Sequence, residues 1–207
     1  MVEKGKRSYG QFCALARSLD VVGDRWTLLI VRELLPGPMR YTELKTALDG
    51  IATNLLAERL KSLEANGIVE RRLEDAGVGY ALTPWGAGLR EPMEALGRWG
   101  VPLLATGQGD DVFRPRWLTM ALPALMRGAT ASPPVELGIE TDGFLLSLRI
   151  DENGPSASVP DQRPASVLTA VPDVVVALAT GAITVEQALA AGEFEGDANV
   201  LRAAFAG

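Results

Sequence analysis

The sequence has no histidine and only one cysteine, Cys13, among its 207 residues. Without histidine the chain cannot form a His-ligated zinc site, a histidine-containing catalytic triad or a histidine pH switch. A single cysteine cannot form an internal disulfide, which is typical of proteins of the reducing cytoplasm. No apolar run reaches the length of a membrane span, and the segment MVEKGKRSYGQF lacks the apolar stretch of a secretory signal. We therefore expect a cytoplasmic protein without membrane contact.

Groups that could perform catalysis are also scarce. The sequence shows no pairing of a nucleophile with a base, no cluster of metal ligands and no phosphate-binding loop. We expect that the protein is not an enzyme and that it uses no cofactor and no metal.

The negative charge is concentrated in the C-terminal half. Residues 1–106 hold 14 Lys and Arg against 13 Asp and Glu, or +1, and the remaining 6 against 13 give −7, which together make the net −6. Within residues 1–72 the balance is 12 against 9, or +3. Because local charge decides contact with phosphates, the acidic total does not exclude a nucleic-acid partner. The polar break GQGDD at 107–111 suggests two domains, residues 1–106 and 112–207.

The first domain has the order of elements of a winged helix-turn-helix. Helices are predicted from the stripe Phe12, Leu15, Ala16 and Leu19, from RWTLLIVRELL with Asp24 as its cap, and from RYTELKTALDG. A fourth helix carries Leu56, Leu60 and Leu63 at i, i+4 and i+7 and ends at Asn66-Gly67. The segments 68–73 and 79–83 then read as two strands of a hairpin.

The fourth helix leaves a polar face outward. If its leucines face the core, the outward residues are Thr53, Asn54, Ala57, Glu58 and Lys61. The short side chains at the helix start would let it approach base edges in a DNA groove, and Lys61 could pair with a phosphate. Arg71 and Arg72 add positive charge beside the wing. The alternative is an ordinary solvated face on a packing helix. Glu58 is unfavourable near phosphates unless it pairs with an arginine or accepts from a cytosine.

Residues 12–106 resemble the HxlR-type transcriptional regulators of bacteria. The resemblance depends on the start at Cys13, GDRWTLLIVREL, the run L-x-x-R-L-x-x-L-E at 56–64 and LT-x-x-G-x-x-L at 82–89. It implies a dimeric repressor or activator that binds double-stranded operator DNA through the fourth helix. By this resemblance Thr53, Asn54, Ala57 and Lys61 are the groove and phosphate residues, with Arg40 at the start of the preceding helix.

A narrow apolar seam predicts a homodimer. Thr83 can cap a helix with Pro84 at its first position. Apolar residues then recur at spacings of four and three: Trp85, Leu89, Pro92, Leu96, Trp99 and Leu103. The alternative is that this seam packs onto its own domain. We expect Pro92 to kink the helix, so a long regular coiled coil is not predicted.

Cys13 is a candidate redox residue. It lies near a helix start, with Arg17 one turn further on, and both features favour the thiolate. Some HxlR-type regulators sense oxidants through a cysteine at the matching position. The alternative is a small buried hydrophobic residue.

The C-terminal half predicts an α+β domain. Short strands at 135–140, 144–151 and 155–159 are joined by the turns TDG and ENG. Residues 172–206 resemble the end of a sterol-carrier-protein-type domain, with Ala188-x-x-x-Gly192 and Gly196-Asp197 in the matching places. The resemblance implies a mixed sheet covered by helices around an apolar tunnel for a lipid-like ligand. The candidate pocket residues are Trp117, Met120, Leu125, Phe144 and Leu146, and the alternative is a solid core.

The sequence thus predicts an α+β protein with an N-terminal winged helix-turn-helix and a C-terminal sterol-carrier-like domain. Its expected function is sequence-specific, dimeric regulation of transcription, modulated by an apolar small molecule. The alternative is a lipid or small-molecule carrier whose helical domain makes only protein contacts.

Overall fold

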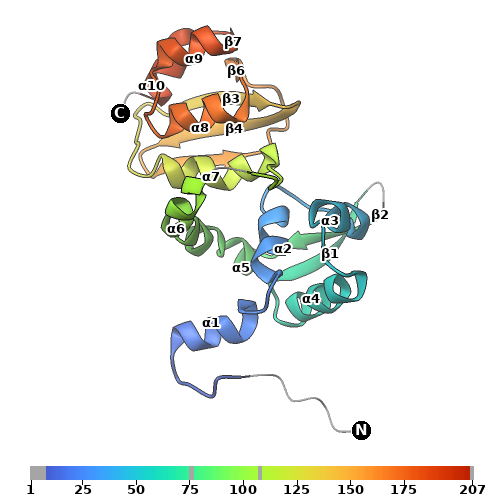
Figure 1. Cartoon of the computed structure of the whole chain (residues 1–207). Coiled ribbons are helices and arrows are strands. Elements are labelled where there is room, and N and C mark those ends of the chain that lie inside the picture. The colour runs from blue at the N-terminus through green and yellow to red at the C-terminus, as the bar shows by residue number, and fades with distance from the viewer. Residues whose placement is uncertain (1–7, 75–76, 107–108, 206–207) are drawn as a thin grey trace, which may run out of the picture. The chain divides into compact units, whose positions relative to one another are not determined.

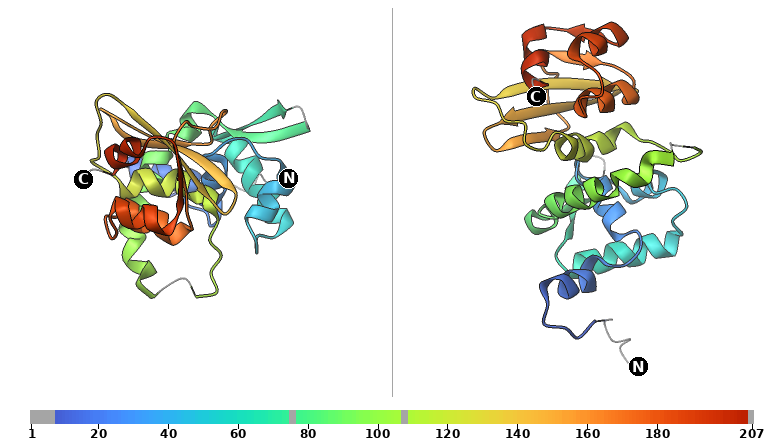
Figure 2. Two further views of the ribbon diagram at one scale, coloured as in Figure 1. Left: turned by 90° about the horizontal axis from the view of Figure 1, so that it is seen from above. Right: turned by 60° about the vertical axis from the view of Figure 1, so that its left-hand side comes forward.

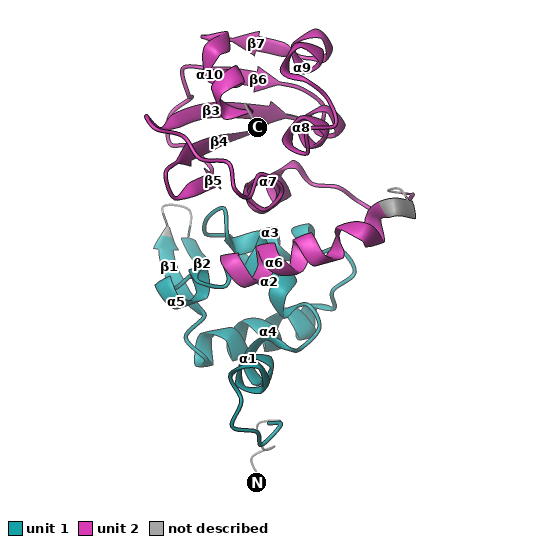
Figure 3. Ribbon diagram, turned by 90° about the vertical axis from the view of Figure 1, so that its left-hand side faces the viewer, with its two compact units in different colours: residues 1–89 teal, residues 90–207 magenta. Residues whose placement is uncertain are grey.

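The computed structural model describes residues 8–74, 77–106 and 109–205, and it divides into two compact units, residues 1–89 and 90–207 (Figures 1 and 3). The first unit begins with α1 (Ala14–Val22), α2 (Thr27–Leu34), α3 (Tyr41–Ala47) and α4 (Thr53–Ala65). The hairpin of β1 (Val69–Glu74) and β2 (Gly77–Leu82) and the short α5 (Pro84–Ala87) follow. The predicted helix-turn-helix order and hairpin are confirmed.

The core of the first unit is formed by the apolar faces of α2, α3 and α4. Its completely or almost completely buried side chains are Ile30, Leu34, Leu44, Leu48, Ile51, Leu56, Leu60, Leu63 and Ile68. A third short strand segment joins the hairpin, since Met39 and Tyr80 exchange backbone hydrogen bonds of 3.0 and 2.8 Å. The segment that leads into α3 is therefore hydrogen-bonded to strand β2 of the wing.

The helix predicted at the start of the chain is present as α1, although Phe12 precedes it. Only Ala16 of the apolar stripe is buried, whereas Phe12 is fully exposed and Leu15 is 67% exposed. One prediction for this region is wrong. Asp24 does not cap α2, because Trp26 holds the N-cap position and the Asp24 carboxylate pairs with Arg59 instead.

The helix that was expected to run from Pro84 to Leu103 is interrupted. After α5 the chain turns at Gly88 and Leu89, and α6 (Arg90–Gly100) and the 3₁₀ helix η1 (Val101–Thr106) follow. Pro92 lies in the first turn of α6, where a missing N–H costs no helical hydrogen bond. The proline ring excludes a helical carbonyl four residues earlier, at Gly88, which is where the break occurs. The break therefore replaces the predicted kink.

In the second unit, η2 (Pro115–Trp117) and α7 (Leu118–Leu125) precede a five-stranded sheet. The strands are β3 (Val135–Thr141), β4 (Phe144–Asp151), β5 (Gly154–Ser158), β6 (Val167–Thr169) and β7 (Glu193–Glu195), in the order β5-β4-β3-β6-β7. The β3–β6 pair is parallel, and the other pairs are antiparallel. The mixed sheet that was predicted is confirmed.

The helices that cover the sheet lie on one side of it (Figures 2 and 3). They are α7, α8 (Pro172–Ala179), α9 (Val185–Ala191) and α10 (Ala198–Ala204). The face they cover is apolar, with fully buried Leu137, Ile139, Leu146, Leu148 and Leu168. The other face carries polar residues, and there Arg163 bridges Glu140 and Glu195 at 2.7 and 3.3 Å.

The end of the chain has the predicted order of elements. Gly192 follows α9 in an extended conformation, and a Cβ there would lie 2.6 Å from the carbonyl oxygen of Thr169. Gly196 has φ +100°, and the Asp197 carboxylate accepts from the N–H of Asn199 to cap α10. Glycine is therefore required at 192 by close packing and at 196 by backbone geometry. The sterol-carrier assignment itself stays a prediction.

The five candidate pocket residues do not form one group. Leu146 is fully buried in the core and Phe144 packs against it. On α7, Leu118 and Leu122 face the core, whereas Met120 and Leu125 on α7 and Trp117 at the end of η2 are half-buried. Residues four apart at 118 and 122 share the inward face of α7. The pocket assignment of the five residues stays a prediction.

The compact units divide earlier than the break at 107–111. Helix α6 packs against α7 and belongs to the second unit, and the guanidinium of Arg90 donates to the Thr119 carbonyl oxygen at 2.9 Å. The proposed functional boundary at 106 therefore stays a prediction. In the part of the chain that the structure describes, no helix is long and apolar enough to cross a membrane.

Candidate nucleic-acid interface

Helix α4 presents the expected polar face. Leu56, Leu60 and Leu63 are at most 1% exposed, which fixes the rotation of the helix about its axis. The residues on the opposite side are all exposed, namely Thr53, Asn54, Ala57, Glu58 and Lys61. The structure therefore confirms that these side chains face solvent, while their contacts with DNA stay a prediction.

Both ends of α4 are held in place. At its start, the hydroxyl of Tyr41 in α3 donates to the backbone carbonyl oxygen of Thr53 at 2.7 Å. At its end, Gly67 has φ +70° and the N–H of Ile68 donates to the Leu63 carbonyl oxygen at 3.0 Å, as a glycine C-terminal cap requires. The helix is thus fixed at the position where a groove would be read.

The carboxylate of Glu58 is paired with an arginine, which was one of the two conditions for its place near phosphates. Its Oε1 lies 3.2 Å from Nη1 of the neighbouring Arg59. Because this pairing offsets the negative charge, Glu58 is compatible with a surface that approaches phosphates. Lys61 makes no ion pair with the described residues, so its charge is available for a phosphate.

Arg40 lies at the N-cap of α3 and is exposed. Its backbone N–H donates to the Glu43 carboxylate at 2.6 Å, which fixes its main chain. Its contact with a phosphate stays a prediction.

The two wing arginines are already paired. Arg71 forms an ion pair of 2.8 Å with Glu64 and lies 5.6 Å from the centre of the Tyr80 ring, and the hydrogen bond to Glu64 raises the pKa of Arg71. Arg72 pairs with Glu70 at 2.8 Å. Consecutive strand residues point to opposite faces, so the two guanidinium groups cannot both face the same groove. The prediction from the sequence put both arginines beside the wing and did not distinguish the two faces of the strand.

Most of the predicted dimer residues are exposed. Trp85 is 64% exposed in the first unit, and Leu96, Trp99 and Leu103 are 52, 74 and 72% exposed in the second, whereas Leu89 is half-buried. The exposure of these large apolar side chains is compatible with a partner surface, and the dimer seam stays a prediction.

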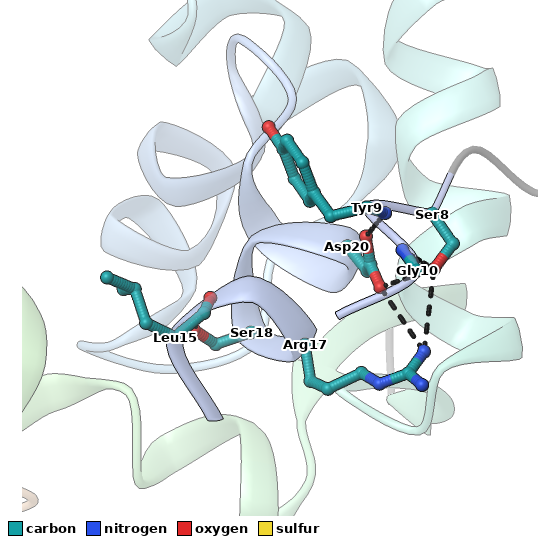
Figure 4. Close-up of polar contacts among 7 residues, drawn as sticks. All are labelled: Ser8, Tyr9, Gly10, Leu15, Arg17, Ser18 and Asp20. Carbon is teal, nitrogen blue, oxygen red and sulfur yellow. Dashed lines mark hydrogen bonds and ion pairs between the residues drawn. The ribbon is translucent and has the colours of Figure 1, made fainter. Parts of the chain in front are cut away.

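Cys13 is exposed at the N-cap of α1, where its carbonyl oxygen accepts from the Arg17 N–H at 2.9 Å. It is therefore not the small buried residue of the alternative interpretation. The Arg17 guanidinium is turned toward Ser8 and Asp20, at 3.4 and 3.6 Å (Figure 4). Asp20 also accepts from the Ser8 hydroxyl and the Tyr9 N–H, both at 2.9 Å. The positive charge that was expected to favour the thiolate is thus shared with Asp20.

The described residues include no group of three or more Cys, Asp or Glu side chains that could hold a metal ion. Sequence reasoning missed Arg59, whose side chain is only 16% exposed and joins Asp24 to α4. The role of Arg59 is visible only from its ion pair with Asp24, 35 positions earlier, and no local sequence pattern predicts that pair.

The first half of the chain is similar in sequence to known helix-turn-helix proteins. The family model of HxlR-like helix-turn-helix proteins matches residues 21–107. The HTH-type transcriptional regulator YvaP of Bacillus subtilis is 34% identical over 86 residues, which cover 40% of this chain and 80% of YvaP. The chain belongs to the HxlR-like helix-turn-helix family. YodB of the same organism, an HTH-type transcriptional regulator, is 36% identical over 85 residues, or 40% of this chain and 76% of YodB. The solved reduced form of YodB is 34% identical, covers 47% of this chain and 99% of that chain, and gives a TM-score of 0.41.

The HxlR-like chain is accordingly a DNA-binding transcriptional regulator, and its relatives are regulators rather than enzymes. The alternative in which the helical half makes only protein contacts is therefore wrong. The family match ends at residue 107, so it does not bear on the second half of the chain.

The exposed face of α4 gives a prediction for DNA binding. Asn54→Ala should cost about 1–3 kcal/mol at one base position, because a short amide at the helix start can read a base edge. Lys61→Ala should weaken all sequences alike and lower the salt slope of binding by about 1, because it removes one phosphate contact. Fluorescence anisotropy with a selected duplex over a salt series measures both. Arg149→Ala, an equal change of charge in the second unit, is the control and should change neither quantity.

Proposed function

We propose that the protein binds an inverted-repeat operator as a homodimer, with the start of α4 from each subunit in a major groove. The observation that carries this proposal is the polar, exposed face of α4 above a fully buried leucine stripe. Half-sites should lie about 10 base pairs apart or at a multiple of this spacing, because two α4 helices related by a two-fold axis meet the same side of the duplex.

Exposed apolar side chains support the homodimer. In α1 and the segment before it, Phe12 and Leu15 are largely exposed, and in α6 and η1 so are Leu96, Trp99, Leu103 and Leu104. Soluble monomers rarely expose large apolar groups in such number on neighbouring turns, so a partner surface is the simplest reason for them. A second copy of the chain presents the same apolar groups and can bury them isologously.

The dimer proposal predicts the effect of a charge in the seam. Leu96→Glu should give monomers and lose tight operator binding, because a carboxylate would be buried without a partner. Sedimentation velocity measures the oligomeric state, and anisotropy measures the binding. Ala95→Glu places the same charge on the next exposed residue of α6 and should leave a dimer. A dimeric Leu96→Glu protein would show that the subunits join elsewhere.

Redox control through Cys13 is a further part of the proposal. The exposed thiol at the start of α1 can be oxidised by a peroxide to a sulfenic acid, while the peroxide is reduced and water is released. The adjacent Phe12 is fully exposed, so a change of polarity here would act on the proposed dimer surface.

Mild peroxide should therefore change the operator affinity of the native protein. The Cys13→Ser variant should bind normally under reducing conditions and should not respond to peroxide. Anisotropy before and after peroxide, followed by a thiol reductant, measures this. Native protein that ignores peroxide, or a Cys13→Ser protein that still responds, would limit Cys13 to a structural role.

We also propose an uncharged apolar effector for the sterol-carrier-like second unit. Support comes from the order of elements at the chain end and from half-buried apolar side chains, Trp117 at the end of η2 and Met120 and Leu125 on α7. The net −7 of residues 107–207 disfavours anionic ligands. Such an effector regulates DNA binding only if its affinity differs between the two binding states.

Native mass spectrometry of the purified protein should then show a co-purified lipid-like mass, and long-chain fatty alcohols should quench tryptophan fluorescence. Met120→Trp should block the site and abolish the titration, whereas the conservative Met120→Leu should keep it. A protein without bound mass and without quenching would have a solid second unit.

A further inference from the structure

The turn between α1 and α2 is fastened directly to the DNA-reading helix. Asp24 in this turn places its Oδ2 3.2 Å from Nη1 of Arg59, which lies in the second turn of α4. The Arg59 side chain is 16% exposed and Asp24 is 55% exposed, so the pair lies at the edge of the unit's interior. An arginine held this deeply cannot extend to a phosphate without leaving its site.

The same turn also contacts the segment that leads into α4. Trp26 has φ +77°, a left-handed conformation that is unusual for a bulky residue and persists only where the surroundings hold it. A Cβ added to Gly50, in the turn between α3 and α4, would lie 3.9 Å from Cη2 of Trp26, so the indole tip packs against this glycine. The start of α4 is therefore held from the α1–α2 turn at two places.

Arg59 also controls the charge of the outward face. The Nη1 atom that binds Asp24 lies equally 3.2 Å from Oε1 of Glu58, whose side chain is 70% exposed among the residues proposed to face DNA. One guanidinium nitrogen is thus shared between a carboxylate of the turn and a carboxylate of the reading face. Because both attachments use the same atom, moving Asp24 would alter the position of Arg59 and the environment of Glu58 together.

We infer that Asp24 and Arg59 are positioning residues for operator recognition, which set the orientation of α4 and hold Glu58 without contacting DNA. The inference rests on the proposed reading of DNA by α4. Asp24 follows α1 by two residues, so this ion pair joins the end of α1 to α4.

Asp24→Asn separates positioning from simple charge. Removing a carboxylate from a DNA-binding unit should strengthen binding to every duplex if only long-range repulsion mattered. Loss of positioning should instead weaken binding to the operator. We expect operator binding roughly two- to fivefold weaker, the range of a partly exposed ion pair. The salt slope and the affinity for random duplex should stay unchanged, so specificity falls. Asp49→Asn removes an equal charge from the loop before α4 and is the matched control, with binding equal to or tighter than that of the native protein.

A double-mutant cycle with Arg59→Lys checks that the effect passes through the pair, because lysine cannot bridge two carboxylates as a guanidinium does. The losses in log affinity should be less than additive. Additive losses, or an Asp24→Asn protein that binds the operator as tightly as the native one, would overturn the inference.

Lys61→Ala, measured beside these variants, distinguishes failure of the positioning role from failure of DNA reading by α4. If it lowers the salt slope while Asp24→Asn has no effect, only positioning is refuted. If it too has no effect, the reading role of α4 fails and the inference with it.

Discussion

The burial of Leu56, Leu60 and Leu63 is the constraint on which the exposed polar face of α4 depends. Each fully buried leucine contributes about 1.5–3 kcal/mol relative to exposure, so a rotation of α4 that exposed all three would cost most of the stability of a small domain. The face opposite the stripe is consequently fixed toward solvent. Contacts at its two ends, through Tyr41 and Glu64, and the Asp24–Arg59 ion pair in its second turn further limit how the helix can tilt.

Periodic burial made much of the fold predictable from the sequence. The i, i+4, i+7 spacing of leucines defined α4, and Asn66-Gly67 correctly marked its end. Alternating strand residues and glycine turns located β3, β4 and β5 within one residue or two. In each of these cases the signal is local, because the residues that determine the element lie within it or directly beside it.

The sequence failed where an outcome depended on distant residues. An apolar stripe on α1 predicts burial, yet Phe12 and Leu15 stay exposed because no other described element of the chain covers them. Likewise Trp117, Met120 and Leu125 are as apolar as Leu118 and Leu122, and only the position of the sheet decides which set faces inward. The partner of Asp24 lies 35 positions away in Arg59, so its apparent role as a helix cap was a local guess that a tertiary ion pair displaced.

The wing arginines affect how the protein would search a chromosome. Arg71 and Arg72 each carry a carboxylate of the same chain, Glu64 and Glu70, in the place of a phosphate. If the wing contacts DNA as proposed, these pairs compete with phosphates, so less counterion release would be gained there than the number of basic residues suggests. Residence on random sequence would then be short, and hopping would be favoured over one-dimensional sliding. Stable binding would be left to the sites that α4 is proposed to read.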